Sequence, residues 1–223
     1  MNTSSIPLLE LFKLGGVIMW PLLFFSVAVV AISIDRIIFL LYHNLRIDDL
    51  AEKVSGYVEK RDYESAAEYL SALTKRHMGA RILLKLVQQL QQHSKLGNDF
   101  SEYRAERACE TEAMNCINSL ENGFNFLTAL GSISPLTGFL GTVTGMISAF
   151  RSIAHAAEIN AQIVASGIYE ALITTVFGLV ISIVAMIFHS IFCHIVDKFA
   201  ARAEGACSGL IAQLAALTTG TSE

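Results

Sequence analysis

The sequence is poor in charge, proline and cysteine, and each shortage excludes a class of protein. Only 16% of its 223 residues are charged, whereas a soluble domain has about 25%. The net charge of −4 gives no reason to expect nucleic acid as a partner. Three prolines exclude proline-rich linkers, and four cysteines without a C-x-x-C pair exclude the usual zinc and thioredoxin-like motifs.

Motifs for catalysis and cofactor binding are missing as well. The six histidines do not form the H-x-x-x-H or H-E-x-x-H spacing of a metal-binding helix. The glycine-rich stretch 138–145 lacks the lysine of a phosphate-binding loop and lies in an apolar segment. We therefore expect no enzyme, no cofactor and no metal site. No β-type alternation stands out, so the chain is predicted to be all-helical.

What the sequence does contain is a set of long apolar segments, which indicate an integral membrane protein. An apolar run of about 18 residues or more is long enough to cross a bilayer as a helix. We assign three transmembrane helices, to residues 15–42, 122–150 and 163–196. The second and third are expected to be long and to extend into a helical cytoplasmic region.

The remaining segments are assigned by their polarity. Residues 1–14 are expected to form a periplasmic or interfacial helix, with a frayed tail as the alternative. Residues 43–121 are expected to form the cytoplasmic helical region, and residues 151–162 a periplasmic loop. Residues 197–223 are expected to form a cytoplasmic C-terminal tail that is disordered after Leu217.

The polar region is predicted to continue into the second membrane helix without a break. Residues 101–123 contain no proline and only a final glycine, so one long helix is expected there. An amphipathic helix is expected before it, ending near Gly97, because apolar residues recur at helical spacing. These residues are Ile82, Leu83, Leu86, Val87 and Leu90.

Lysine and arginine set the predicted orientation, because cytoplasmic loops carry an excess of both. Most of them fall on one side of the predicted spans, so we expect a periplasmic N-terminus and a cytoplasmic C-terminus. Cys109, Cys116 and Cys207 then lie in the cytoplasm and are expected to be free thiols. The basic residues on the cytoplasmic side are Arg46, Lys53, Arg104, Arg107, Lys198 and Arg202, and those on the other side are Lys13 and Arg151.

One acidic residue, Glu170, interrupts the third apolar segment. No other residue between Gln162 and Asp197 carries a formal charge, although His189 and His194 could gain one. An ionised acid at a helix centre costs about 2.5–3.5 kcal/mol on insertion scales, so such a residue indicates a function. We predict that Glu170 binds and releases protons. The alternative is an interfacial acid that reaches the lipid headgroups.

Threonines near this acid could carry protons, because a hydroxyl both donates and accepts a hydrogen bond. At about 100° per residue, Thr174 lies ~40° from Glu170 around the helix, whereas Thr175 lies ~140° away. Helix geometry alone therefore favours Thr174 as the neighbour of the acid. Thr142 is one of several hydroxyl residues in the second span, most of which are expected to bond their own backbone.

The second span also carries a face of glycines. Gly138, Gly141 and Gly145 follow Gly131 at offsets of seven, three and four, which places all of them on one side of a helix. Gly141-x-x-x-Gly145 is a small-residue pattern that lets helices approach closely, although glycine is common in membrane spans.

Pro135 interrupts the hydrogen bonding of the same span. Its missing N–H leaves one carbonyl oxygen without its usual helical donor. Such a carbonyl needs another partner in lipid, where no water is available. Ser132, Ser134 or Thr137 is predicted to supply it.

Two sequence motifs resemble those of the MotA/TolQ/ExbB proton-channel family. Residues 134–150, SPLTGFLGTVTGMISAF, resemble its A-P-L-L-G-L-L-G-T-V-x-G-M-I-x-x-F core. Residues 167–179, GIYEALITTVFGL, resemble its third-span motif G-I-x-E-A-L-x-T-T-A-x-G-L. Residues 15–22 and the Asp35-Arg36 pair are similar to the family's first span, where Glu-Arg is more usual.

The sequence departs from the family pattern at two places. Thr144 stands where tryptophan is usual, and residues 181–185 lack the proline of the family's A-I-P-A. The third helix is therefore expected to be straighter than in other members. Three spans argue against the flagellar MotA branch, which has four.

The resemblance implies a pentamer in the inner membrane of a Gram-negative bacterium. It also implies a dimer of a single-span ExbD-like or TolR-like protein inside the pore, a TonB-like or TolA-like partner, and contact with membrane lipids. By motif position, Glu170, Thr175 and Thr142 match the functional residues of the family. Geometry favours Thr174 and the family favours Thr175, so both stay candidates for the proton pathway. Helix packing and pore lining are assigned to Pro135, Gly138, Gly141, Gly145 and Gly178.

Three functions fit these implications. The match of residues 15–22 favours an ExbB-like subunit that uses the proton motive force to energise TonB-dependent uptake across the outer membrane. The second is a TolQ-like subunit of the Tol-Pal system for envelope integrity and cell division. The third is a stand-alone channel for a small ion.

Overall fold

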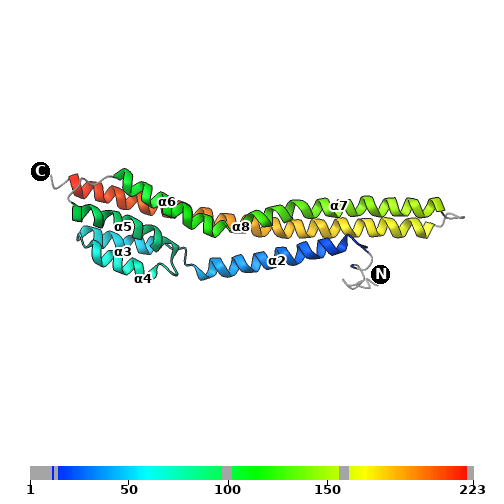
Figure 1. Cartoon of the computed structure of the whole chain (residues 1–223), viewed down its shortest axis with the longest axis horizontal. Helices are drawn as coiled ribbons and strands as arrows, with labels where there is room; N and C mark the ends of the chain where they lie inside the picture. The colour runs from blue at the N-terminus through cyan, green and yellow to red at the C-terminus, as the bar shows by residue number, and fades with distance from the viewer. Residues whose placement is uncertain (1–11, 13–14, 97–101, 156–160, 220–223) are drawn as a thin grey trace, which may run out of the picture. The chain divides into compact units, whose positions relative to one another are not determined.

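The described part of the chain is built from α-helices. A computed structural model describes Phe12 and residues 15–96, 102–155 and 161–219 (Figure 1). Every regular element in these residues is a helix, and three of the helices are long and apolar enough to cross a membrane. The prediction of an all-helical membrane protein with three spans is confirmed. The helix predicted at residues 1–14 falls almost entirely outside the described residues.

The helices divide between two units. The described residues within 1–35 and 123–191 form one unit, called the apolar unit here, and those within 36–122 and 192–223 form the other, called the polar unit. The helices are α2 (Met19–Tyr42), α3 (Asp48–Glu59), α4 (Tyr63–Leu73), α5 (Met78–Leu96), α6 (Glu102–Glu121), α7 (Phe124–His155) and α8 (Ala161–Thr219).

The polar region does not continue into the second span as one helix, so that prediction is wrong. α6 ends at Glu121 and α7 begins at Phe124, with Asn122 and Gly123 between them. Gly123 has φ of 92°, a left-handed conformation that favours glycine and that an α-helix cannot contain. Its carbonyl accepts from the N–H groups of Phe126 and Leu127 at 3.1 and 3.4 Å, which starts α7.

The last two helices are longer than the predicted spans. α7 continues to His155 and α8 begins at Ala161, so the loop expected at residues 151–162 is helical at both ends. Residues 156–160 lie outside the described part of the chain. α8 continues to Thr219, through most of the segment expected to be a tail, since its apolar pattern continues there. The buried residues of this extension are Phe199, Ala203, Cys207, Leu210 and Leu214.

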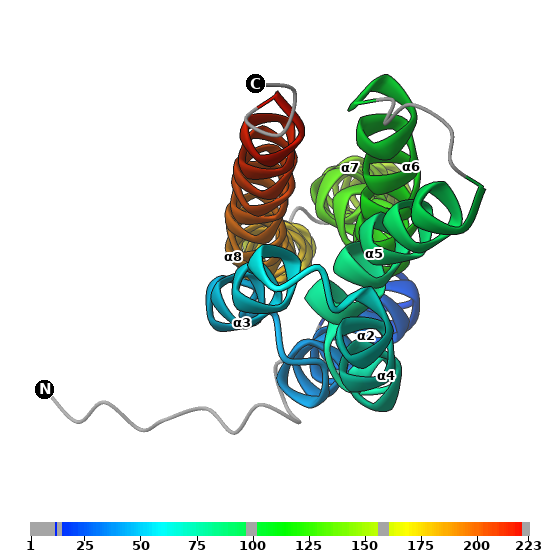
Figure 2. The ribbon, with the colours of Figure 1, turned by 90° about the vertical axis from the view of Figure 1, so that its left-hand side faces the viewer.

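The polar unit has a core of large aliphatic side chains. α5 contacts α3, α4 and α6 (Figure 2). Local signals start these helices: Asp48 and Asp49 occupy the first turn of α3, and the Asp62 carboxylate accepts from the Ser65 N–H at 3.1 Å at the start of α4. The core residues of α5 are Met78, Ile82, Leu83, Leu86, Val87 and Leu90.

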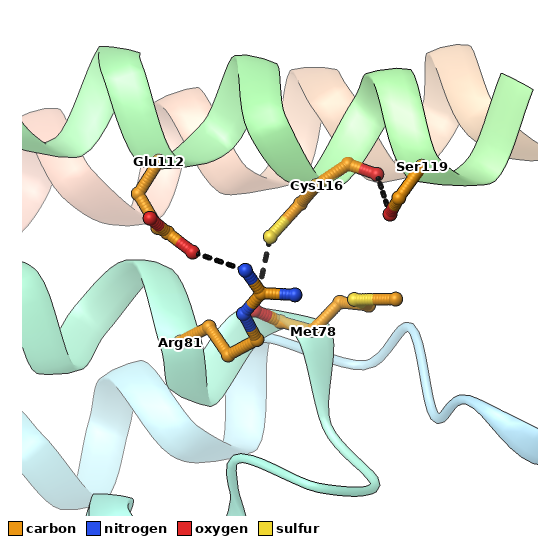
Figure 3. Close-up of polar contacts among 5 residues, drawn as sticks. All are labelled: Met78, Arg81, Glu112, Cys116 and Ser119. Atoms are coloured by element: carbon orange, nitrogen blue, oxygen red, sulfur yellow. Dashed lines mark hydrogen bonds and ion pairs between the residues drawn. The ribbon is translucent and has the colours of Figure 1, made fainter.

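Polar contacts tie α5 to α6 beside this core (Figure 3). Arg81 donates to Glu112 at 2.7 Å, and the Glu112 side chain is only 12% exposed. Cys116 lies 4.0 Å from the Met78 carbonyl oxygen, and burial raises the pKa of the Cys116 thiol to about 11. All four cysteines are free, as predicted for Cys109, Cys116 and Cys207.

Candidate functional site

The glycine face of α7 packs against α8 of the same chain. A Cβ atom added to Gly138 would lie 2.8 Å from the Thr174 carbonyl oxygen and 3.4 Å from the Gly178 Cα. A Cβ atom added to Gly178 would lie 2.6 Å from the Ser134 carbonyl oxygen. The distances of 2.8 and 2.6 Å to carbonyl oxygens are too short for any side chain, so the two backbones touch. The face is therefore occupied by α8 of the same chain.

The contact continues along both helices. A Cβ atom on Gly145 would lie 3.2 Å from the Ala171 Cβ, and one on Gly167 would lie 3.3 Å from the Ala149 Cα. The register places Glu170 next to a tightly packed stretch of α8. Small residues, and not large apolar ones, thus fix the position of the acid.

Thr174 and Thr175 both point at α7. Thr174 is 1% exposed, and its side chain fills the space left by Gly141, whose added Cβ would lie 2.6 Å from the Thr174 Cβ. The Thr174 hydroxyl lies 2.8 Å from the Ala171 carbonyl oxygen and 3.3 Å from that of Gly138. The Thr175 hydroxyl donates to the same Gly138 oxygen at 3.2 Å. Both candidate threonines therefore meet at one backbone oxygen of α7.

Glu170 lies at the edge of this interface. Its side chain is half-buried, and its carboxyl group touches Gly16 in the turn before α2. A Cβ atom on Gly16 would overlap the Oε1 oxygen of Glu170 and lie 3.0 Å from its Cδ. Gly16, Glu170 and both threonines belong to the apolar unit. The sequence analysis assigned Gly15 and Gly16 to the start of the first span and did not place them at the acid.

Thr142 lies on α7 and is half-buried. Its hydroxyl donates to the Phe139 carbonyl at 2.6 Å. This bond stays within the helix, so the structure does not join Thr142 to Glu170. Thr137 and Thr144 also donate to carbonyls of α7, those of Ile133 and Leu140, both at 3.0 Å.

The carbonyl freed by Pro135 is that of Gly131, and its partner comes from α8. The Ser182 hydroxyl donates to the Gly131 oxygen at 2.5 Å. The prediction that Ser132, Ser134 or Thr137 would serve is wrong, because each of them bonds a different carbonyl one turn back on α7. Ser182 lies in residues 181–185, where the sequence departs from the family pattern by lacking its proline. That departure was the one sequence feature that drew attention to this stretch.

No metal centre forms in the described residues, where no three His, Cys, Asp or Glu side chains lie close enough to share an ion. At the contact between α7 and α8, Glu170 lies beside the hydroxyls of Thr174 and Thr175, with that of Ser182 further along α8. The arrangement can bind a proton on a carboxylate beside a few donor and acceptor groups, which fits transfer of protons.

Comparison with known proteins gives a consistent match. Residues 75–205 match the MotA/TolQ/ExbB proton channel family. The chain is 31% identical over 183 residues to the putative biopolymer transport protein ExbB-like 3 of Synechocystis, covering 80% of this chain and 81% of the relative. It is 27% identical over 146 residues to ExbB of Salmonella typhimurium, covering 64% of this chain and 59% of the relative.

A relative of a second type matches a shorter stretch more closely. The chain is 46% identical over 70 residues to the Tol-Pal system protein TolQ of Haemophilus influenzae, which covers 31% of each chain. The chain spans about three fifths of the length of ExbB of Salmonella typhimurium. From the extent of the family match and the Synechocystis relative, this chain belongs to the MotA/TolQ/ExbB proton channel family.

Proposed function

We propose that this chain is an ExbB-like proton-channel subunit of a bacterial inner-membrane motor. With an ExbD-like partner, it uses the proton motive force to energise TonB-dependent uptake across the outer membrane. The observation that carries the proposal is Glu170, an acid half-buried in an apolar helix beside a glycine-packed contact with α7. An acid in such surroundings is retained for a function, because its insertion is unfavourable.

Glu170 is the group that takes up and releases protons in this proposal. Thr174 and Thr175 lie next along α8, and their hydroxyls share the Gly138 oxygen of α7. A hydroxyl that rotates can pass a hydrogen bond from one partner to another. We assign these threonines to the pathway next to the acid, and Thr142 to its continuation on α7.

The pore is formed by several copies of the chain. The glycine face of α7 is covered by α8 of the same chain, so the pore is lined by other faces of these two helices. Both helices expose large apolar side chains, such as Phe139 and Ile147 on α7 and Leu172 and Val176 on α8. These surfaces would contact lipid and neighbouring copies in a pentamer that encloses a dimer of the single-span partner.

The orientation in the membrane is part of the proposal. The N-terminus lies in the periplasm, and α3–α6 and the C-terminus lie in the cytoplasm. The support is the distribution of Lys and Arg, since Arg46, Lys198 and Arg202 follow the ends of α2 and of the apolar stretch of α8.

A TolQ-like role in the Tol-Pal envelope-integrity and cell-division system is the second candidate. The observation that favours it is the 46% identity to TolQ of Haemophilus influenzae over 70 residues. The same Glu170 site would drive a TolR-like and a TolA-like partner in that case.

The test replaces the acid in the native organism. Glu170→Gln removes the charge and the proton site but keeps the shape of the side chain, so proton-driven function should be lost. Glu204→Gln on the exposed part of α8 is the matched control and should keep full function. Uptake of iron complexes reports an ExbB-like role, and resistance to detergents reports a TolQ-like role. Full activity of the Glu170→Gln variant in both assays would overturn the proposal.

The partners decide between the two branches. Purification of the chain with its native partners, followed by mass measurement of the intact complex, should show five copies with an ExbD-like dimer. A TolR-like partner would favour the second candidate. A strong proton current from the purified chain alone would support a stand-alone channel and contradict both.

A further inference from the structure

The turn before α2 is packed onto α8 at the acid. Gly16 has φ of 65°, and a Cβ atom there would overlap the Glu170 Oε1 and lie 3.0 Å from Cδ and 3.7 Å from Cγ. Three atoms of one side chain thus lie within contact distance of a single backbone position. The carboxyl group rests on the main chain of the turn, in space that any side chain other than hydrogen would fill.

The turn is held in place by the residues on both sides of Gly16. A Cβ atom on Gly15 would lie 3.4 Å from the Ile173 Cγ2, one turn along α8 from Glu170. Met19 is 1% exposed, and its N–H donates to the Gly16 carbonyl at 3.3 Å. The contact with Glu170 is therefore made by a packed turn and not by the tip of a loose loop.

Two requirements for glycine coincide at this position. The left-handed φ alone favours glycine, as it does at Gly123, where φ is 92°. The contact with the carboxyl group is a separate requirement, because it concerns the space that a Cβ atom would fill and not the backbone angle. An experiment can separate the two by comparing the same substitution at both glycines.

We propose that Gly16 is a positioning residue for Glu170: the Gly15-Gly16 turn forms one wall of the proton site and fixes where the carboxyl group lies. This inference rests on the proposed role of Glu170. It makes the segment before α2 part of the proton site, in addition to α7 and α8. A methyl group at position 16 displaces the carboxyl group without changing its chemistry.

The test measures the reactivity of Glu170 itself. Dicyclohexylcarbodiimide, an apolar reagent, modifies protonated carboxyl groups in membranes, and mass spectrometry of the full chain reports the modified fraction of Glu170. Gly16→Ala fills space that the carboxyl group of Glu170 now occupies, so the carboxyl group must move and its access to the reagent must change. At one fixed pH, the labelled fraction of Glu170 should therefore differ clearly from that of the unmodified chain. Gly123→Ala also places alanine at a positive φ, 92° against 65° at Gly16, and should label as the unmodified chain does.

A shortened acid provides the second arm. Glu170→Asp withdraws the carboxyl group by one methylene from position 16. Proton-driven function of the native complex should fall in Gly16→Ala, and should be higher in the Gly16→Ala, Glu170→Asp double variant than the two single losses combined predict. Additive losses, or labelling of Gly16→Ala at the unmodified rate, would overturn the inference.

Poor folding of Gly16→Ala would not leave the question open. In a Glu170→Ala background the overlapping atoms are gone, so the Gly16→Ala change should accumulate in membranes as well as Gly123→Ala does. Continued loss there would show that the backbone angle alone requires glycine and would overturn the inference. Failure of the proposed function would give a different result, which is an active Glu170→Gln variant.

Discussion

Helices inside the two units pack through residues of different size. In the polar unit, α5 buries leucine, isoleucine, valine and methionine side chains against its neighbours. In the apolar unit, α7 and α8 meet through Gly138, Gly145 and Gly178, with backbone atoms in contact and large side chains turned outward. The packing of α5 therefore depends on large side chains, whereas the contact between α7 and α8 depends on small ones.

The solvent around each unit explains the difference. In water, burial of large apolar side chains provides the driving force for packing. In lipid that force is missing between helices, because the acyl chains are as apolar as leucine. Association there depends on close approach and on hydrogen bonds, for which glycine and hydroxyl residues are suited. The composition of each interface thus supports the assignment of the apolar unit to the membrane.

The largest effect is expected from removing bulk in the polar unit. Leu83 on α5 is 0% exposed, and Leu83→Ala should destabilise the protein by about 2–5 kcal/mol through lost burial and a cavity. In a protein of this size, the midpoint of thermal unfolding in detergent should fall by about 2–4 °C per kcal/mol. Leu84→Ala, at the next and only half-buried position, is the matched control and should lose less. Equal losses at both positions would contradict the proposed core.

Adding bulk at the contact between α7 and α8 should have the next largest effect. Gly178→Ala places a methyl group 2.6 Å from the Ser134 carbonyl oxygen, which must force the helices apart at about 1–3 kcal/mol. Gly205→Ala lies on the same helix, and nothing comes within 4 Å of its new methyl group. That control should stabilise the protein by about 0.5–1 kcal/mol, as alanine does in a helix. Matching shifts in the unfolding midpoint would show that the contact at Gly178 does not depend on the absence of a side chain.

Much of this architecture could be predicted because it follows from patterns along one helix. Apolar length gives the three spans, and the spacing of Gly138, Gly141 and Gly145 gives a single glycine face. The presence of Glu170 in an apolar run points to the site without any knowledge of the fold. Each of these inferences needs only the pitch of a helix and the polarity of its residues.

Contacts between elements distant in sequence could not be predicted in the same way. Gly16 lies against Glu170 because of how the turn before α2 packs on α8, which no local spacing encodes. The break at Gly123 depends on a left-handed angle that the glycine permits but does not require. The donor to the carbonyl freed by Pro135 was expected on α7 itself, and it is Ser182 on α8.

That hydrogen bond predicts the smallest of the three effects and tests whether α7 and α8 depend on polar contacts. Ser182→Ala leaves the Gly131 oxygen without its 2.5 Å donor next to Pro135, where the helix offers no replacement N–H. The loss should be about 1 kcal/mol, in the range measured for hydrogen bonds between membrane helices. Ser132→Ala removes a bond to the Thr128 oxygen, which keeps its own helical donor, so the unfolding midpoint should hardly change. Adding Pro135→Ala to the Ser182→Ala variant should recover most of the loss. The alanine has a backbone N–H, which can donate to the Gly131 oxygen within α7. No recovery would mean that Ser182 acts through packing and not through the carbonyl that Pro135 frees.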